Sequence, residues 1–119
     1  MEADEYISSF LEEGGIPFSQ YCHEAIYTVE GGLDIAGQLG LTPSKCLLLV
    51  NRQHQYYLLL WEGNAPVDLR LVARAADSSR LSFASREDMA RLLRAAPGAV
   101  SPLGLVFDTS HLIRFIIDA

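Results

Sequence analysis

The chain has 119 residues, enough for one hydrophobic core and too few for two, so we expect a single domain over residues 1–119. Half of the residues are apolar and 20% are charged, which is typical of a folded globule and excludes a disordered chain. The net charge of -6 argues against broad nucleic-acid binding, so we expect no DNA partner. No apolar run reaches the ~20 residues of a membrane helix, and residues 1–5 lack the basic region of a signal peptide. We therefore expect a cytoplasmic protein without membrane contact.

The first third of the chain predicts two helices. Apolar residues recur at helical spacing over residues 4–13, and Gly14-Gly15 ends that pattern. An extended piece is expected around Pro17. A weaker second helix is expected over residues 28–39, diluted by glycine and closed by Gly40.

The centre of the chain predicts a hairpin followed by capped helices. Residues 45–51 and 55–61 are apolar β runs separated by three residues. Asp68 is a cap residue before a short helix, and residues 80–83 are a short strand. Ser85 with Asp88 resembles a capping box that opens another helix. This helix is expected to end at Pro97-Gly98, followed by strand-like runs over residues 105–107 and 112–117. The pattern predicts an α+β fold with a mixed, largely antiparallel sheet.

Basic residues are unevenly distributed. Residues 1–44 contain no Lys or Arg, whereas six arginines lie close together in a later stretch: Arg70, Arg74, Arg80, Arg86, Arg91 and Arg94. They form either a local basic face or a solvated surface paired with Asp77, Glu87 and Asp88. Lys45 is the only lysine, and it opens an apolar strand. It is therefore either a functional group with a partner or a strand-end residue whose ammonium reaches water.

Other reactive side chains form no recognisable site. Cys22 and Cys46 fit neither a disulfide framework nor a zinc pattern, so we expect no metal and no cofactor. No nucleophile elbow or Ser-His-Asp arrangement is present, and we expect His54 and His111 at the surface, with His111 beginning the last strand.

Several segments together resemble one family. They are Val67-Asp68-Leu69, Arg80 to Ser85, Pro97 to Leu105, His23 to Glu30, and Lys45 followed by apolar residues. This combination is similar to the YbaK/prolyl-tRNA-synthetase-associated editing domain family, and within it to the free-standing PrdX-type alanyl-tRNA(Pro) deacylases. The resemblance implies a sheet curled into a partial barrel with helices around it. It also implies hydrolysis of the ester that joins an amino acid to the terminal ribose of tRNA. The implied partners are the acceptor end of an aminoacyl-tRNA and prolyl-tRNA synthetase.

The resemblance also implies a site. Lys45 matches the family's functional lysine, and Gly98 with Pro102 matches its G-x-x-x-P substrate loop. The implied catalytic residues are Lys45 and Gly98, and the implied substrate-binding residues are Lys45, Cys46, Gly98, Ala99, Val100, Ser101 and Pro102. Cys46 stands where PrdX-type members usually have asparagine. An aminoacyl ester is already activated, so a placed water, an electrostatic anchor and backbone N–H donors are sufficient for hydrolysis.

Three alternatives stay open at this stage. The substrate is Ala-tRNA(Pro) by resemblance, with Cys-tRNA(Pro) or another small-amino-acid ester as the second choice. A non-catalytic module that recognises tRNA or a synthetase is the third. Family members continue beyond the point that corresponds to Ala119, so we expect either a shortened chain or a pocket without part of its wall. Candidate apolar walls are Leu47, Leu49, Leu58 and Leu60.

Overall fold

The computed structural model describes residues 3–20, 37–40, 44–62, 66–97 and 99–117. Its backbone contacts divide the chain into two compact units, Met1–Leu41 and Thr42–Ala119, and each is described by itself. Most of the predicted second helix, Cys22 and Gly98 lie outside the described residues. None of the helices in the described ranges is long and apolar enough to cross a membrane. That residues 1–119 form a single domain stays a prediction.

The first unit contains helix α1 (Ala3–Glu13), which confirms the predicted helix over residues 4–13. The N–H of Gly14 donates to the carbonyl of Phe10, and the N–H of Ile16 donates to the carbonyl of Leu11. Gly15 has a φ of 67°, a conformation that favours glycine and ends the helix as expected. Residues 37–39 are helical, and Gly40 closes them with a φ of 69°.

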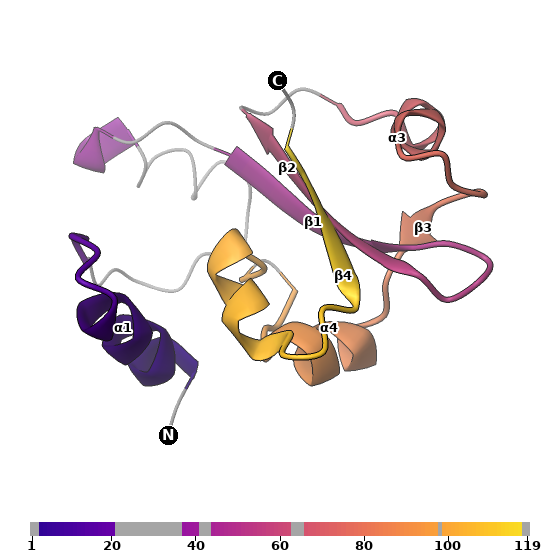
Figure 1. The fold of residues 1–119 in the computed structure, drawn as a ribbon. Coiled ribbons are helices and arrows are strands. Elements are labelled where there is room, and N and C mark those ends of the chain that lie inside the picture. The colour runs from indigo at the N-terminus through magenta and orange to yellow at the C-terminus, as the bar shows by residue number, and fades with distance from the viewer. Residues whose placement is uncertain (1–2, 21–36, 41–43, 63–65, 98, 118–119) are drawn as a thin grey trace. The chain divides into compact units, whose positions relative to one another are not determined.

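The second unit is built on a four-stranded sheet (Figure 1). β1 (Ser44–Val50) pairs antiparallel with β2 (Tyr56–Glu62), and β3 (Ser82–Phe83) pairs antiparallel with the end of β1. β4 (Ile113–Ile117) pairs parallel with β2, which gives the order β3-β1-β2-β4. The α+β class and the mixed, largely antiparallel sheet are confirmed. The sheet is open in the described residues and is not closed into a barrel.

Asn51 fixes the turn of the β1–β2 hairpin. Its side chain is 6% exposed, and its Oδ1 accepts hydrogen bonds from the backbone N–H groups of Gln53 and Gln55. Its amide nitrogen donates to Gln55 Oε1 at 2.8 Å and to Ser78 Oγ at 3.1 Å. Every polar atom of this buried amide is therefore paired, and His54 completes the turn with a φ of 58°.

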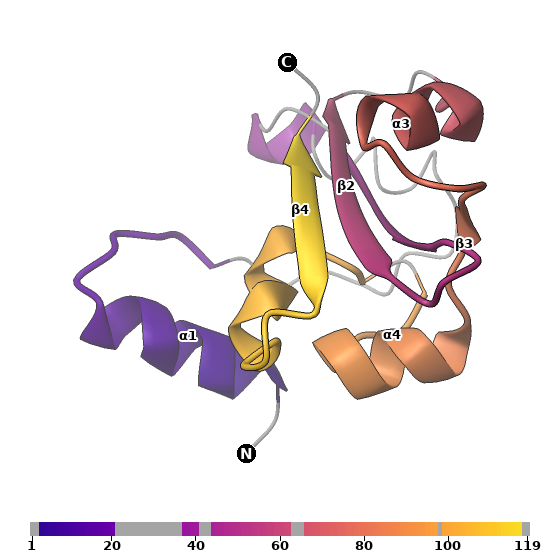
Figure 2. The ribbon, with the colours of Figure 1, turned by 45° about the vertical axis from the view of Figure 1, so that its right-hand side comes forward.

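The core lies on both faces of the sheet. Alternate strand residues point to opposite faces, and each face is covered by one helix, α3 (Leu69–Ala75) or α4 (Arg86–Leu93). The α3 face carries the cluster Leu49, Tyr57, Leu59, Val72, Ala73 and Leu81. The α4 face carries the cluster Leu48, Leu58, Ala84, Leu92 and Leu93. Figures 1 and 2 show α3 and α4 on opposite sides of the sheet.

Both helices begin at the predicted cap residues. Asp68 Oδ1 accepts from the N–H of Arg70 at 2.9 Å, and Ser85 Oγ accepts from the N–H of Asp88 at 3.1 Å. α4 ends earlier than predicted, because Arg94 takes a left-handed conformation with a φ of 51° and closes the helix before Pro97.

The strand predicted over residues 105–107 is wrong. This run belongs to the 3₁₀ helix η1 (Pro102–Phe107). Pro102 stands at the first position of η1, where its fixed φ suits a helix and its missing N–H costs nothing. Ser101 Oγ caps the helix by accepting from the N–H of Leu103 at 3.1 Å. Ser101 and Pro102 are therefore helix-start signals that outweigh the apolar character of residues 105–107.

The strand predicted over residues 112–117 is confirmed as β4. Asp108 is 9% exposed, and its carboxylate accepts from the N–H groups of Leu112 and Ile113, both at 2.9 Å. His111 lies in the turn before the strand with a φ of 54°, rather than in the strand itself.

We predict that Leu58→Ala lowers the free energy of unfolding by about 2–5 kcal/mol, because Leu58 is 0% exposed and its removal leaves a cavity. The matched control is Leu71→Ala, which truncates a leucine that is 59% exposed and should change stability by less than about 0.5 kcal/mol. Urea unfolding of both variants makes the comparison. If both variants lost the same free energy of unfolding, the placement of Leu58 in the core and of Leu71 at the surface would be contradicted.

Candidate functional site

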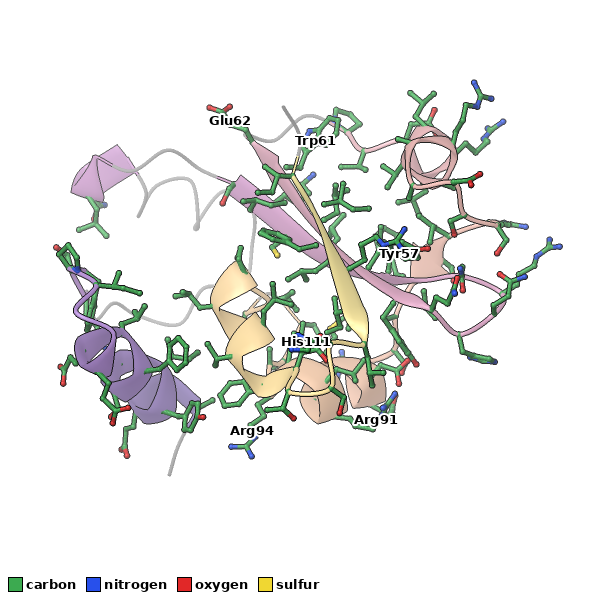
Figure 3. The ribbon with its side chains drawn as sticks, viewed as in Figure 1. Tyr57, Trp61, Glu62, Arg91, Arg94 and His111 are labelled. Carbon is green, nitrogen blue, oxygen red and sulfur yellow. The ribbon has the colours of Figure 1, made fainter. Side chains whose placement is uncertain are left out.

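Lys45 is the second residue of β1, half-buried and directly opposite Trp61 of β2. Leu47 and Leu49 pack on the α3 face, and strand alternation therefore assigns Lys45 to the same face. Within the described part of the chain, its ammonium forms no ion pair and no hydrogen bond. Figure 3 shows Trp61 and Glu62 at the end of the sheet away from Arg91 and His111. Lys45 is thus a charge without a described partner at the Trp61 end of the sheet.

The edge of β1 is open beside Lys45 in the described residues. β3 is only two residues long and pairs with Leu49 and Val50 alone. The flexible four-carbon stem of a lysine can carry its ammonium along such an edge. Lys45 can therefore extend its ammonium beside this edge.

Cys46 lies on the α4 face of the sheet. It is half-buried and packs against the cluster that contains Leu48 and Leu58, and Val100 packs against the same cluster. Burial raises the pKa of the Cys46 thiol to about 11. The thiol is therefore neutral near pH 7 and is a poor nucleophile.

The loop before η1 offers few backbone donors. Gly98 lies outside the described residues. The N–H of Ala99 donates to the carbonyl of Ala96 at 3.0 Å, and Pro102 has no N–H. Within the described residues, the N–H groups of Val100 and Ser101 donate no hydrogen bond. This distinction between loop residues could not be made from the sequence.

Gly104 holds η1 close to α4. A Cβ added at Gly104 would lie 3.3 Å from two side-chain atoms of Leu93 and 3.4 Å from its carbonyl oxygen. Leu93 is 2% exposed and cannot easily move. The small residue therefore lets η1 approach α4 and fixes where the substrate loop leaves the helix.

Two of the clustered arginines, Arg91 and Arg94, interact with neighbouring side chains at or near α4. Arg91 donates to Asp88 Oδ1 at 2.8 Å and to the hydroxyl of Tyr56 at 3.2 Å, and Tyr56 in turn donates to Asp88 Oδ2. The hydrogen bond from Arg91 lowers the pKa of the Asp88 carboxyl. Arg94 places its guanidinium over the ring of Phe107 at 4.7 Å. Arg91 and Arg94 therefore interact with other residues of the same fold.

Two surface clefts occur in the described residues, and neither includes Lys45, Cys46 or the loop at 99–102. One, of about 750 Å³, is lined by Asp68, Leu69, Arg70, Ala73, Arg74, Ser78, Arg80 and Leu81. The other, of about 590 Å³, is lined by Gln55, Tyr56, Tyr57, Ala76, Asp77, His111, Leu112, Ile113 and Arg114. The predicted site residues therefore lie outside the described lining of both clefts.

Among the candidate wall residues, the structure separates core from surface. Leu49 and Leu58 are both 0% exposed and belong to opposite faces of the sheet. Leu47 and Leu60 are half-buried, so only these two can border a ligand. No group of three or more His, Cys, Asp or Glu side chains in the described ranges could hold a metal ion. His54 and His111 are exposed, as expected.

A solved structure shares this α+β architecture. The chain superposes on the crystal structure of hypothetical protein APE2540 with a TM-score of 0.73, covering 94% of this chain and 72% of that one. Sequence identity in this pair is 16%, so the match establishes the fold alone.

The sequence establishes the family. Residues 23–119 match the aminoacyl-tRNA editing domain, and the chain belongs to that family. It is therefore an aminoacyl-tRNA deacylase, a hydrolase of the ester between an amino acid and tRNA.

Two curated relatives match much of the chain. It is 27% identical to the prolyl-tRNA editing protein ProX of Acetoanaerobium sticklandii over 120 residues, which cover 99% of this chain and 73% of that protein. It is 30% identical over 97 residues to the proline–tRNA ligase of Bacillus licheniformis, covering 80% of this chain and 16% of the ligase.

We predict that Cys46 reacts slowly with iodoacetamide in the folded protein. A thiol with a pKa of about 11 instead of 9.0 carries roughly one hundredth of the thiolate at pH 8. The rate should rise about a hundredfold when urea unfolds a Cys22→Ser variant, in which Cys46 is the remaining thiol. The same shift makes the folded state lose stability as the pH rises from 9 towards 11, because the unfolded thiol ionises first. Equal alkylation rates in buffer and urea would contradict the buried, neutral thiol.

Proposed function

We propose that the chain is a trans-editing enzyme that removes alanine from mischarged Ala-tRNA(Pro). The observation that carries the proposal is the editing-domain match over residues 23–119, which includes Lys45, Cys46 and the loop up to Pro102. It is supported by the likeness to a protein named for prolyl-tRNA editing and to a proline–tRNA ligase. The proposed partners are the acceptor end of the tRNA and prolyl-tRNA synthetase, and the proposed location is the cytoplasm.

The proposed reaction is attack of water on the aminoacyl ester. Lys45 anchors the terminal phosphate or the ester end of the substrate from the sheet edge. The N–H groups of Val100 and Ser101, with Gly98 as the conformationally free residue of the loop, stabilise the oxyanion that forms on the carbonyl oxygen. The neighbouring ribose hydroxyl of the substrate accepts the proton of the attacking water and passes its own to the ribose oxygen that leaves when the ester bond breaks, so the products are the free amino acid and the tRNA hydroxyl. Positioning and electrostatic stabilisation then supply the rate enhancement.

Covalent catalysis by the residues near the loop is not supported. The Ser101 hydroxyl accepts the cap hydrogen bond from Leu103, and no described histidine or carboxylate bonds to it as a general base. The Cys46 thiol is neutral because of its burial. Ser101 therefore serves as the cap of η1, and Cys46 packs against the core. In this proposal, water is the attacking group.

Selection of alanine over proline follows from size in this proposal. A synthetase cannot strongly reject a smaller amino acid by binding, since each missing methylene is worth only ~1–3 kcal/mol. A second site with a smaller pocket admits alanine and excludes proline. Cys46 and the half-buried Leu60 are the proposed walls on the loop side. Initial rates with Ala-tRNA(Pro), Cys-tRNA(Pro) and Pro-tRNA(Pro) test the substrate, and failure to hydrolyse any of the three would favour a binding module.

We predict that Lys45→Ala folds normally and loses most of its deacylation activity. Loss of an electrostatic anchor costs on the order of 2–4 kcal/mol in the transition state, or roughly 30-fold to 1000-fold in kcat/KM. Arg52→Ala, which removes one exposed positive charge from the hairpin turn, is the control and should retain wild-type turnover. A Lys45→Ala enzyme with wild-type kcat/KM would refute the role of this residue.

We predict opposite outcomes for two loop variants. Ser101→Ala should keep its turnover and lose about 0.5–2 kcal/mol of stability, because only the cap of η1 is removed. Gly98→Val should lose turnover, since a β-branched residue restricts the loop backbone and blocks close approach of the ester. Single-turnover rates and thermal unfolding separate the two effects.

The reverse pattern would point to covalent catalysis: an inactive Ser101→Ala with a mildly affected Gly98→Val. If Gly98→Val unfolds, Gly98→Ala serves instead, because its smaller side chain still restricts the loop.

A further inference from the structure

The larger cleft, of about 750 Å³, carries a concentration of positive charge. Among the described residues that line it are three arginines: Arg70 and Arg74 from α3, and Arg80 from the segment that leads into β3. All three are exposed, and within the described residues none of their guanidinium groups has an ion pair or a hydrogen bond. The fold itself therefore does not explain why these cations gather here.

Asp68 is the one acidic side chain among the described residues that line the cleft, and one of its oxygens already accepts a hydrogen bond. Asp68 caps α3 through Oδ1, which accepts from the backbone N–H of Arg70. The remaining polar residue is Ser78, whose hydroxyl donates to the carbonyl of Ser79. The described lining thus presents three cations against one carboxylate, which suits an anionic ligand with more than one charged group.

The two helix arginines have a spacing that suits successive anions. Residues four apart on a helix lie on the same face with Cβ atoms about 5–6 Å apart, so Arg70 and Arg74 project side by side. Leu69, Ala73 and Leu81 hold the floor of the cleft in the α3-face core, which keeps the helix rigid beneath the charges. A strand of linked phosphates, with one charge per unit, fits this arrangement better than a small single anion does.

The cleft also lies on the side of the sheet to which alternation assigns Lys45. Trp61, opposite Lys45, packs against the same α3-face cluster as Val67 and Leu69. Arg91 and Arg94, in contrast, are engaged near α4. Residues 42–119 carry nine basic and seven acidic side chains, whereas residues 1–41 carry eight acidic and no basic ones. The positive surface is therefore local to the second unit, although the whole chain has a net charge of -6.

We propose that the cleft between α3 and Arg80 binds the phosphate backbone of the tRNA, with Arg70 and Arg74 each contacting one phosphate away from the aminoacyl end. This inference rests on the proposed function and adds a second contact region to it. Phosphate contacts of this kind position the RNA and raise its affinity without reading its sequence. Their contribution depends strongly on salt, because binding releases condensed counterions.

The test is binding of uncharged tRNA to the Arg70→Gln/Arg74→Gln double variant, measured by fluorescence anisotropy between 50 and 200 mM salt. The matched control is Arg52→Gln/Arg86→Gln, which removes the same charge from exposed positions outside the cleft. We expect the cleft variant to bind about tenfold more weakly at 50 mM salt, with a salt dependence smaller by about one unit of slope per arginine. The control should bind tRNA with the affinity of the wild type. The midpoint of thermal unfolding should be the same for the wild type and both double variants.

A second readout separates the cleft from the reaction site. Hydrolysis of the alanyl ester of adenosine, which has no phosphate backbone, should proceed at the wild-type rate in the cleft variant. Deacylation of Ala-tRNA(Pro) should show a raised KM with little change in kcat.

Several outcomes would contradict the proposed binding of tRNA phosphates in the cleft. If both double variants weaken binding equally, net charge alone is responsible. If neither does while the wild type binds and deacylates tRNA, the cleft is not a contact and the proposed function stands. If the wild type neither binds nor deacylates tRNA, the proposed function fails together with this inference.

Discussion

The antiparallel pairing of β1 with β2 is the interaction on which the rest of the second unit depends. Leu48 and Leu49 of β1 and Leu58 and Leu59 of β2 are each at most 1% exposed, so this pair is buried on both faces. Two strands buried in this way need a cover on each side, which α3 and α4 provide. Truncating any of these leucines opens a cavity between layers that cannot collapse independently. The pairing also fixes the register, because a slip by one residue would exchange the two faces.

The same alternation decides where the reactive residues lie. Adjacent residues of a strand point to opposite faces, so Lys45 and Cys46 cannot share one. Cys46 packs on the α4 face near Val100, and Lys45 is assigned to the α3 face but stands beside an open edge. A substrate that meets both must therefore lie at the edge of β1. Such a position is compatible with the absence of Lys45 and Cys46 from the described lining of the two surface clefts.

Much of the local structure could be predicted from the sequence, because its signals are carried by single residues. Asp68 and Ser85 mark helix starts by their hydrogen-bonding oxygens, and Gly15 and Gly40 mark ends by their permissive backbone. The strand prediction for residues 105–107 is wrong, because three apolar residues have no period and the Ser101-Pro102 cap starts a 3₁₀ helix there. The arginines could not be sorted from the sequence at all. Whether Arg91 meets Tyr56 or Arg74 lines a cleft depends on contacts between distant segments.

The candidate site was predictable only as a set of residue types. Resemblance supplied Lys45 and the loop, but not the state of Cys46, whose pKa reflects burial against residues far away in the chain. Nor could the sequence show that the Ala99 N–H is already used while those of Val100 and Ser101 are not. These two facts bear on the mechanism in the same direction. A neutral Cys46 thiol and a Ser101 hydroxyl that accepts a cap hydrogen bond both fit the proposed attack by water better than covalent catalysis.

Under the proposed function, the two faces of the sheet divide the work of binding. The α4 face holds Cys46 and the loop, both of a size and polarity suited to a small aminoacyl group. The α3 face holds the arginine cleft, which is suited to phosphates. Lys45 stands at the edge between them, where an aminoacyl ester joins the charged strand of the RNA. Successive residues of β1 point to opposite faces of the sheet. In this proposal, Cys46 therefore contacts the amino acid, whereas Lys45 contacts the RNA end of the same ligand. Such a division lets the aminoacyl wall change, as at Cys46, without disturbing the surface that holds the RNA.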